Sequence, residues 1–337
     1  MTRRSQGRQN KKTRSVREFT VEGELKSMRL FHKLISWILV LVLAAAVLPA
    51  SAEQSPDTVV PSPSPDSTLL RLHQIDIGCG DAYLLTVGDY TVLVDCGTDS
   101  TLPIAQHVHN YPLFDYLEAV GIDHVDLYFV THWHNDHCYN VDTLMELYGR
   151  EDTVVYGSTP ELYAELAPLP TGIYRHLIDG DHFTAGPLDI LCVGPVFRDN
   201  LVGTFNHDSL NFIVTWGNHR FLFTGDFVER TVCKNWPEET ADIDVLSFPH
   251  HGLEPMTMTK ECFRHMDPRL VLIPGRQAGP VKSFAFHTAY AGKDAVYLSM
   301  KDGNLLVTSD GTNLWYAANV VPGELPLGEL LPPRTED

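Results

Sequence analysis

One short stretch, residues 131–137 with the sequence Thr-His-Trp-His-Asn-Asp-His, limits what this chain can fold into more than any other feature. It follows Val125–Val130, a mostly apolar run that indicates a buried strand. Imidazole and carboxylate groups placed where a strand ends can converge on Zn, Fe or Mn ions. The stretch offers four such groups: His132, His134, Asp136 and His137. His132 and His134 share one face of an extended chain and are predicted to bind one ion. Asp136 and His137 lie past the turn and are predicted to bind a second ion.

A polar loop that happens to be rich in histidine is the alternative interpretation of this stretch. It would account for one isolated histidine, but it does not account for four metal-ligating groups within six residues directly after a strand. We therefore predict a metal site.

The charge of the chain is unevenly distributed. Residues 1–52 hold 10 Lys and Arg against 3 Asp and Glu, so the 25 basic and 43 acidic residues of the whole chain leave 15 basic and 40 acidic, or −25, for the remainder. Such a body repels polyanions at long range, which disfavours loose, non-specific binding of nucleic acid. A local metal centre could still attract a phosphate. The length of 337 residues allows one large domain or two small ones.

The N-terminal part has the features of an export signal. Leu34–Leu48 is a mostly apolar run of 15 residues, short for a membrane span but suited to a signal-peptide core. Arg29 and Lys33 precede it, and small residues follow at the end of a predicted signal over residues 28–52. An uncleaved N-terminal anchor is the alternative. In both cases the protein is expected to be exported, either secreted or tethered to the outer face of the cytoplasmic membrane.

The segments around this signal are predicted to be unstructured connections. Residues 1–27 are predicted to be a basic N-terminal extension or the result of a start codon assigned too early. Residues 53–68 are predicted to be a linker rich in Pro and Ser. Residues 321–337 are acidic and contain several prolines, so we expect a loose tail. Six cysteines (79, 96, 138, 192, 233 and 262) permit disulfides in an exported chain but are too few for a disulfide scaffold.

Between the linker and the tail, apolar runs and turn residues predict many short strands and few helices. The predicted strands are Leu69–Ile77, Ala82–Val87, Thr91–Val94, Thr153–Tyr156, Leu188–Val193, Leu210–Trp216, His219–Phe223, Asp244–Phe248, Leu270–Ile273, Ala295–Ser299, Asn304–Thr308 and Asn313–Tyr316. The predicted helices are Leu102–Val120, with a break near Pro112, Val141–Tyr148 and Pro160–Leu166.

Motifs along the chain resemble those of a known superfamily. The H-x-H-x-D-H pattern is similar to the signature of the metallo-β-lactamase fold, and the resemblance covers roughly Leu69–Trp315. Further landmarks are Asp76–Ala82, Asn206–Ser209, Thr224–Asp226 and Pro249–Gly252. Their sub-pattern looks closer to the hydrolase domain of ComEC-type competence proteins and their free-standing exported relatives. The resemblance implies an α/β fold, a four-layer αββα sandwich, as a single domain over residues 69–320.

The resemblance also implies roles for residues far from the first motif. Asp226, delivered by a strand end, would bridge the two ions. Asp95 and Asp81 would support the ligands from behind by hydrogen bonds. One of the neighbouring histidines, His250 or His251, would complete the second metal, and the other would touch the substrate or leaving group; we favour His251 as the ligand.

The chain departs from the family pattern at several positions. Asn206 stands where most members with two metals have a histidine. Three alternatives follow: His207 replaces the missing ligand, the first ion binds with one fewer protein ligand, or the site holds a single metal. Asn206 and Ser209 would then hydrogen-bond substrate oxygens or a loop. His287 matches a late histidine near the site in ComEC-type domains.

These features predict an exported metal-dependent hydrolase with a metal-activated water as nucleophile, acting on a phosphoester or phosphodiester in the manner of a nuclease or phosphodiesterase. Two divalent ions are expected, Zn before Mn, with a single ion not excluded. Asp136 would also orient the nucleophile, while His250 and His287 would contact the developing oxyanion or the leaving group. The alternatives are a hydrolase of lactams, lactones or thioesters and a non-catalytic metal-containing envelope binding protein. The sequence indicates no protein partner.

Overall fold

The computed structural model describes residue 63 and residues 68–99, 111–157, 172–195, 205–227, 232–252, 258–275 and 295–334. Several sequence predictions lie outside these residues: the extension and signal of residues 1–52, most of the linker, the helix Pro160–Leu166 and the site residue His287. Among the helices of the described residues, none has the length and apolar character needed to cross a membrane.

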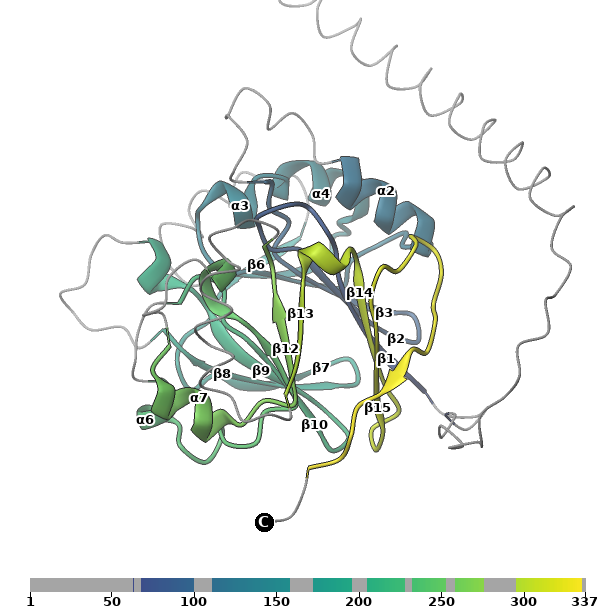
Figure 1. Ribbon diagram of the computed structural model, residues 1–337. Coiled ribbons are helices and arrows are strands. Elements are labelled where there is room, and N and C mark those ends of the chain that lie inside the picture. Colours follow the sequence, from purple (N-terminus) through teal and green to yellow (C-terminus); the bar gives the residue numbers. More distant parts are fainter. Residues whose placement is uncertain are drawn as a thin grey trace, which may run out of the picture. The chain divides into compact units, whose positions relative to one another are not determined.

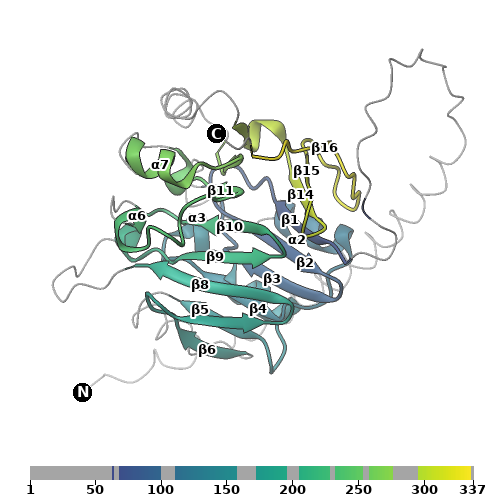
Figure 2. The ribbon, with the colours of Figure 1, turned by 90° about the horizontal axis from the view of Figure 1, so that it is seen from below.

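Two β-sheets form the centre of the described part of the chain. The first has the strand order β16-β15-β14-β1-β2-β3-β4-β5-β6 (Figure 1 and Figure 2). Its strands are β1 (Leu70–Gln74), β2 (Tyr83–Val87), β3 (Tyr90–Val94), β4 (Leu127–Val130), β5 (Val154–Gly157), β6 (Ile173–His176), β14 (Leu305–Ser309), β15 (Leu314–Ala317) and β16 (Glu329–Leu330). Strands β3 to β6 run parallel, whereas β1 is antiparallel to both β2 and β14.

The second sheet has the order β13-β12-β11-β10-β9-β8-β7. Its strands are β7 (His182–Ala185), β8 (Leu188–Gly194), β9 (Asn211–Trp216), β10 (His219–Phe223), β11 (Val245–Ser247), β12 (Leu270–Ile273) and β13 (Val296–Ser299). An antiparallel hairpin joins β9 to β10, and β10 to β13 run parallel. In each sheet, therefore, the carboxyl ends of a group of parallel strands lie on the same side.

Helices lie on the outer side of each sheet, which gives four layers. The helices are α2 (Tyr111–Val120), α3 (Asn135–Cys138), α4 (Val141–Tyr148), α6 (Val232–Asn235) and α7 (Lys260–Met266), with 3₁₀ turns η3 (Phe205–Asp208), η4 (Pro249–Gly252) and η5 (Met300–Asp302). Figure 1 shows α2, α3 and α4 on one side of the two sheets and α6 and α7 on the other. Buried side chains of α2 and α4 pack on the first sheet, and those of α6 and α7 on the second. This arrangement confirms the predicted αββα sandwich.

The main core lies between the two sheets and follows from the alternation of side chains along each strand. Tyr83 and Leu85 of β2 face inward against β9 and β10, whereas Leu84 between them faces the helices. Phe129 stacks on Phe212 with ring centroids 4.1 Å apart. The inward aromatic residues therefore hold the two sheets together directly beneath the strand ends.

The end of the chain differs from the predicted loose tail, and that prediction was wrong as far as residue 334. Strand β16 pairs with β15, and Leu331 is buried. Arg334 donates hydrogen bonds to the Asp267 carboxylate and to the carbonyl of Ile243. The acidic and proline-rich composition gave no indication that this segment packs along the sandwich.

Two further differences concern elements that were not predicted. The short edge strands β6 and β7 are largely exposed and so lack an apolar pattern. Helices α6 and α7 are short and are joined by a disulfide between Cys233 and Cys262. The other four cysteines are buried thiols outside this disulfide, as is usual for cysteines that act as small apolar residues.

Candidate metal centre

The parallel strands bring the predicted site residues to one edge of the sandwich. Residues 131–137 follow the carboxyl end of β4, while Asp226 and His251 follow the ends of the neighbouring strands β10 and β11. Asp81 precedes β2, which is antiparallel to β3, so it lies at the same edge. Side chains that follow strand ends of two packed sheets can therefore point into one space.

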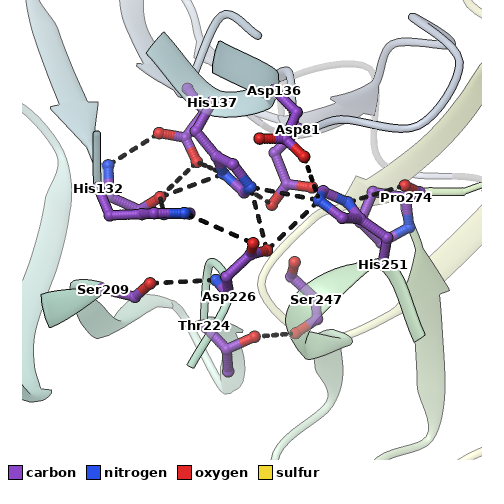
Figure 3. A network of polar contacts seen from close by, with 12 residues as sticks. Asp81, His132, Asp136, His137, Ser209, Thr224, Asp226, Ser247, His251 and Pro274 are labelled. Atoms are coloured by element: carbon purple, nitrogen blue, oxygen red, sulfur yellow. Dashed lines mark hydrogen bonds and ion pairs between the residues drawn. The ribbon is translucent and has the colours of Figure 1, made fainter. Parts of the chain in front are cut away.

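The gathered side chains form two groups of metal donors that share one carboxylate, and Figure 3 shows Asp226 together with His132, Asp136, His137 and His251. The four-donor group consists of Asp136, His137, Asp226 and His251, and the three-donor group of His132, His134 and Asp226. Within each group, one donor atom from each residue lies within 4.8 Å of all the others. All six predicted metal ligands are thus brought together.

Asp226 lies between the two groups, and each of its oxygens faces a different one. Its Oδ1 is 3.0 Å from Nε2 of His137 and 3.4 Å from Nε2 of His251. Its Oδ2 is 3.5 Å from Nε2 of His132. A carboxylate placed in this way can bind two cations at once, as a bridging ligand requires.

The distances within the groups match those expected around a tetrahedral zinc ion. In the four-donor group, Nε2 of His251 lies 3.2 Å from Oδ2 of Asp136 and 3.3 Å from Nε2 of His137. In the three-donor group, Nε2 of His132 lies 3.0 Å from Nδ1 of His134. Bonds of about 2.0–2.1 Å in tetrahedral geometry place neighbouring ligand atoms about 3.3 Å apart. The donor set and its spacing therefore fit a divalent metal.

Asp95 fixes His137 from behind. Its Oδ2 lies 2.8 Å from Nδ1 of His137, and it also accepts hydrogen bonds from the backbone N–H and the hydroxyl of Thr131 at 2.8 and 2.6 Å. A proton on Nδ1 that points to Asp95 leaves the Nε2 lone pair of His137 free for a metal. Asp95 thus stands where the predicted supporting carboxylate was expected.

Asp81 and a backbone carbonyl hold the ring of His251 from behind in the same way. Nδ1 of His251 lies 3.0 Å from the carbonyl oxygen of Pro274 and 3.3 Å from Oδ1 of Asp81. Since one N–H can be shared by these two acceptors, Nε2 of His251 remains a lone-pair donor that faces Asp226. The Pro274 carbonyl was not predicted, because any residue type could supply it.

The backbone around the centre is closely packed and partly strained. Asp95, His250 and His251 have positive φ angles of 56°, 53° and 51°, a region that L-residues with a side chain seldom adopt. A Cβ atom on Gly97 would overlap the carbonyl group of Asp136. Backbone strain of this kind persists where surrounding contacts over-determine it, and it clusters at functional sites.

The charged groups of the centre favour positive charge between them. Burial opposes charge on Asp226, yet the imidazoles of His137 and His251 hold its pKa well below the usual range. Burial also lowers the pKa of His137, but the carboxylates of Asp226 and Asp81 outweigh it and raise that pKa well above its ordinary value. These pKa shifts favour positive charge between the groups, and divalent ions would supply that charge in place of protons. By contrast, burial lowers the pKa of His132 to about 4, so this ring is a neutral donor.

Of the other predicted site residues, Asn206, His250 and Ser209 lie at or beside the centre, and His287 lies outside the described residues. Nε2 of His250 is 3.7 Å from Oδ2 of Asp226 and 3.5 Å from Nδ2 of Asn206, but His250 belongs to neither donor group. His207 is also outside both groups. The fully buried hydroxyl of Ser209 accepts a hydrogen bond from the Asp226 N–H, which fits support of a loop, the second of its two expected roles.

A four-layer αββα sandwich with a carboxylate shared between two donor groups defines a metal-dependent hydrolase. The model of the metallo-beta-lactamase superfamily matches residues 77–276, and the chain belongs to this superfamily. A search of curated proteins finds no match.

Several solved structures align with this chain at low sequence identity. A variant of the CmlA β-hydroxylase of Streptomyces venezuelae aligns with a TM-score of 0.50 and 16% identity over 74% of this chain and 54% of that one. The metallo-beta-lactamase fold protein YhfI from Bacillus subtilis aligns with a TM-score of 0.48 and 16% identity, covering 68% of this chain and 96% of that one. A subclass B3 metallo-beta-lactamase from a soil metagenome, MEM-A1, aligns with a TM-score of 0.36 and 15% identity, covering 53% of this chain and 80% of that one.

Proposed function

We propose that this protein is an exported metal-dependent hydrolase that cleaves a phosphoester or phosphodiester with a metal-activated water. The observation that carries the proposal is the position of Asp226, whose two oxygens face the two donor groups. Two divalent ions held by a common carboxylate are the arrangement used by two-metal enzymes for in-line displacement at phosphorus. Zinc fits the mixed imidazole and carboxylate donors best.

The surrounding side chains have distinct tasks in this reaction. Ions bound by the donor groups would lower the pKa of a water and polarise the scissile group. Asp136 is half-buried, unlike its fully buried partner His251, so its carboxylate can also orient the attacking water. His250 and Asn206 lie together beside the three-donor group, where an N–H from either can donate to a developing oxyanion.

The choice of a phosphoester derives from a closer kinship that we propose with ComEC-type hydrolase domains. Asp81, Asn206 and Ser209 follow the pattern of those domains, and all three lie at the centre or directly beside it. The amide at position 206 also weakens the case for lactam, lactone and thioester hydrolysis, because members with two metals commonly have histidine there.

Export is proposed on two grounds. Residues 28–52 have the composition of a signal peptide. The disulfide between Cys233 and Cys262 is of a kind that forms and persists in oxidising compartments outside the cytosol. The substrate is then expected to be a small extracytoplasmic molecule, since the acidic body disfavours long polyanions.

The test is hydrolysis of a chromogenic phosphodiester by the purified protein with Zn²⁺ or Mn²⁺, beside the Asp136→Ala variant. Loss of a ligand that also positions the nucleophile should lower the rate about a hundredfold or more, the equivalent of several kcal/mol. Asp142→Ala is the matched control, because Asp142 is an exposed acidic residue of α4 outside both donor groups. It should retain full activity.

The other two functions give different results in the same assay. Turnover of a chromogenic lactam, lactone or thioester but not of the phosphodiester would place the protein among the acyl hydrolases. Bound metal with no turnover of any of these substrates would contradict the enzyme and favour a binding protein.

A further inference from the structure

We infer that the two donor groups load unequally: the four-donor group holds a resident ion, and the three-donor group binds a second, exchangeable ion at least about tenfold more weakly. The inference rests on the proposed metal centre but not on the choice of substrate. Four independent features of the described residues support it, and each concerns a different property of the two groups.

The first feature is the number and charge of the donors. The four-donor group contains two carboxylates, Asp136 and Asp226, whereas the three-donor group has only the shared Asp226. A zinc ion in the four-donor group therefore has a complete tetrahedral set of protein ligands. An ion in the three-donor group has three protein ligands and shares its one negative charge with a neighbouring cation, so its binding is weaker on both counts.

The second feature is the support behind the histidines. Nδ1 of His137 points to the carboxylate of Asp95 at 2.8 Å, and Nδ1 of His251 to the Pro274 carbonyl at 3.0 Å. In the three-donor group, Nδ1 of His132 faces the hydroxyl of Thr131, at 3.3 Å. Anionic and carbonyl acceptors make an imidazole a stronger and better oriented ligand, and loss of such support commonly lowers metal affinity about 10–100-fold.

The third feature is access to solvent. In the four-donor group His137 and His251 are fully buried and Asp136 is partly exposed, whereas in the three-donor group His134 is half-buried and follows the exposed Trp133. An ion leaves more readily where a histidine ligand is accessible to solvent, because water can replace that ligand without opening the core. The three-donor group thus lies on the open side of the centre.

The fourth feature is Asn206, which lies beside the incomplete group. Its Nδ2 is 3.5 Å from Nε2 of His250, which in turn is 3.7 Å from Oδ2 of Asp226. Its Oδ1 is buried and has no hydrogen-bond partner among the described residues, so this amide is available to a bound water or ligand. An amide is a weak zinc ligand, so Asn206 would not complete the three-donor group, whose fourth position is left for a substrate oxygen.

The inference predicts that the amount of active enzyme follows the ambient metal concentration. The resident ion would stay bound through purification, while occupancy of the three-donor group would rise and fall with free Zn²⁺. The same open position would bring the substrate and the second ion together.

The test is a titration of chelator-stripped protein with Zn²⁺ by calorimetry and by competition with a chromophoric chelator, without substrate. Two steps that differ at least about tenfold are expected, with one ion retained after desalting, counted by elemental analysis. His134→Ala should remove the second step and leave the first, and Asp136→Ala should weaken the first. Two equal steps, or a single ion in the wild-type protein, would overturn the inference.

The sharpest variant is Asn206→His, which restores a fourth donor. It should tighten the second step about tenfold or more and raise the number of retained ions toward two, while Asn206→Ala, which adds no donor, should not tighten it. His207→Ala addresses the competing possibility that His207 supplies the missing ligand. A second step weakened by His207→Ala, or unchanged in a folded Asn206→His protein, would contradict the unequal loading proposed here. Circular dichroism of each variant establishes that it is folded.

Discussion

Gly97 lies where two backbone segments meet behind the metal centre. The N–H of Cys96 donates to the carbonyl of His137, and the N–H of Thr98 donates to that of Asn135, so the segment after β3 runs along the backbone of the ligand stretch. A side chain at position 97 would occupy the space of the Asp136 carbonyl. The absence of a Cβ there is therefore a requirement of the metal centre and not of a turn.

Gly97→Ala is predicted to displace Asp136 and lower zinc affinity of the four-donor group about tenfold or more, with a matching loss of activity. Retained metal and hydrolysis rate are the measurements. Gly88→Ala is the control, because Gly88 has a positive φ of 60° but no atom within 4 Å of the added Cβ. It should cost about 1 kcal/mol of stability and leave the metal content unchanged. Normal zinc retention in a folded Gly97→Ala protein would contradict the prediction.

His73 is a buried histidine outside the metal centre, and it should make stability depend on pH. Its Nδ1 lies 2.9 Å from the Tyr116 hydroxyl, and burial, with a smaller effect of Arg71, lowers its pKa to about 4. Below pH 6.5 the unfolded chain binds a proton that the folded protein rejects, so this stability is present above pH 6.5 and lost as the pH falls toward 4. Between pH 7 and 5 the loss is about 2 kcal/mol.

Urea unfolding of chelator-stripped protein at the two pH values measures this effect, with His73→Gln as the comparison. The other titrating groups are common to both proteins, so the difference between the two pH dependences isolates His73. Equal pH dependence in the two proteins would show that His73 is protonated in the fold or accessible to water.

At the scale of single residues, the sequence predicted the metal-ligating side chains better than the groups that form hydrogen bonds with them. The spacing of residues 131–137 fixes local geometry, which is why its four donors are found together. The choice between His250 and His251 depends on a left-handed backbone at both positions, which no residue type in the motif requires. Thr131 and the Pro274 carbonyl act through groups that many residues possess, and sequence gives no signal for them.

At the level of elements, the disulfide between α6 and α7 is the main feature that sequence left open. Cys233 and Cys262 are 29 residues apart, and closing a loop of that length stabilises a fold by about 3–4 kcal/mol in the chain-entropy account. Both follow metal ligands along the chain, Cys233 after Asp226 and Cys262 after His251. The bond therefore restrains the two helices that come next after the ligand loops of the second sheet.

Cys233→Ser is predicted to lower the free energy of unfolding by about 3 kcal/mol, and reduction of the wild-type protein in denaturant before refolding should have a similar effect. Thermal unfolding with and without dithiothreitol is the measurement. The variant itself should be insensitive to the reductant, which serves as the control. A wild-type protein that unfolds at the same temperature after reduction would refute this role.

Elements with a clear apolar period were predicted well, and those without one were not. Helix α4 has the predicted bounds, Val141–Tyr148. The two residues of β16 are too few to show any period, and β6 and β7 lie at sheet edges where polar side chains are tolerated. Pairing with a neighbouring strand, which is a long-range property, defines these three elements.

On the scale of the whole molecule, the acidic body should govern which phosphodiesters reach the centre. With a charge of −25 over residues 53–337, repulsion slows the approach of a polyanion far more than that of a small monoanion. Salt screens this repulsion over about 10 Å at 0.1 M. Hydrolysis of an oligonucleotide is therefore predicted to become faster as salt is raised from about 20 to 200 mM, while that of a small diester changes little.

Values of kcat/KM for the two substrates across this salt range are the measurement. An oligonucleotide rate that falls with salt would indicate a basic binding surface and would contradict the predicted repulsion. Magnesium should be held constant, so that duplex stability and counterion binding do not change with the salt.

The ligands of the centre come from both sheets, and this has a consequence for how the protein unfolds. His132 to His137 follow a strand of the first sheet, while Asp226 and His251 follow strands of the second. Each donor group therefore needs both sheets, and a bound ion is a cross-link between them that forms without any covalent bond. Separation of the sheets would release both ions together, so the loaded protein should resist unfolding kinetically, and the lifetime of the fold would be set by the availability of metal.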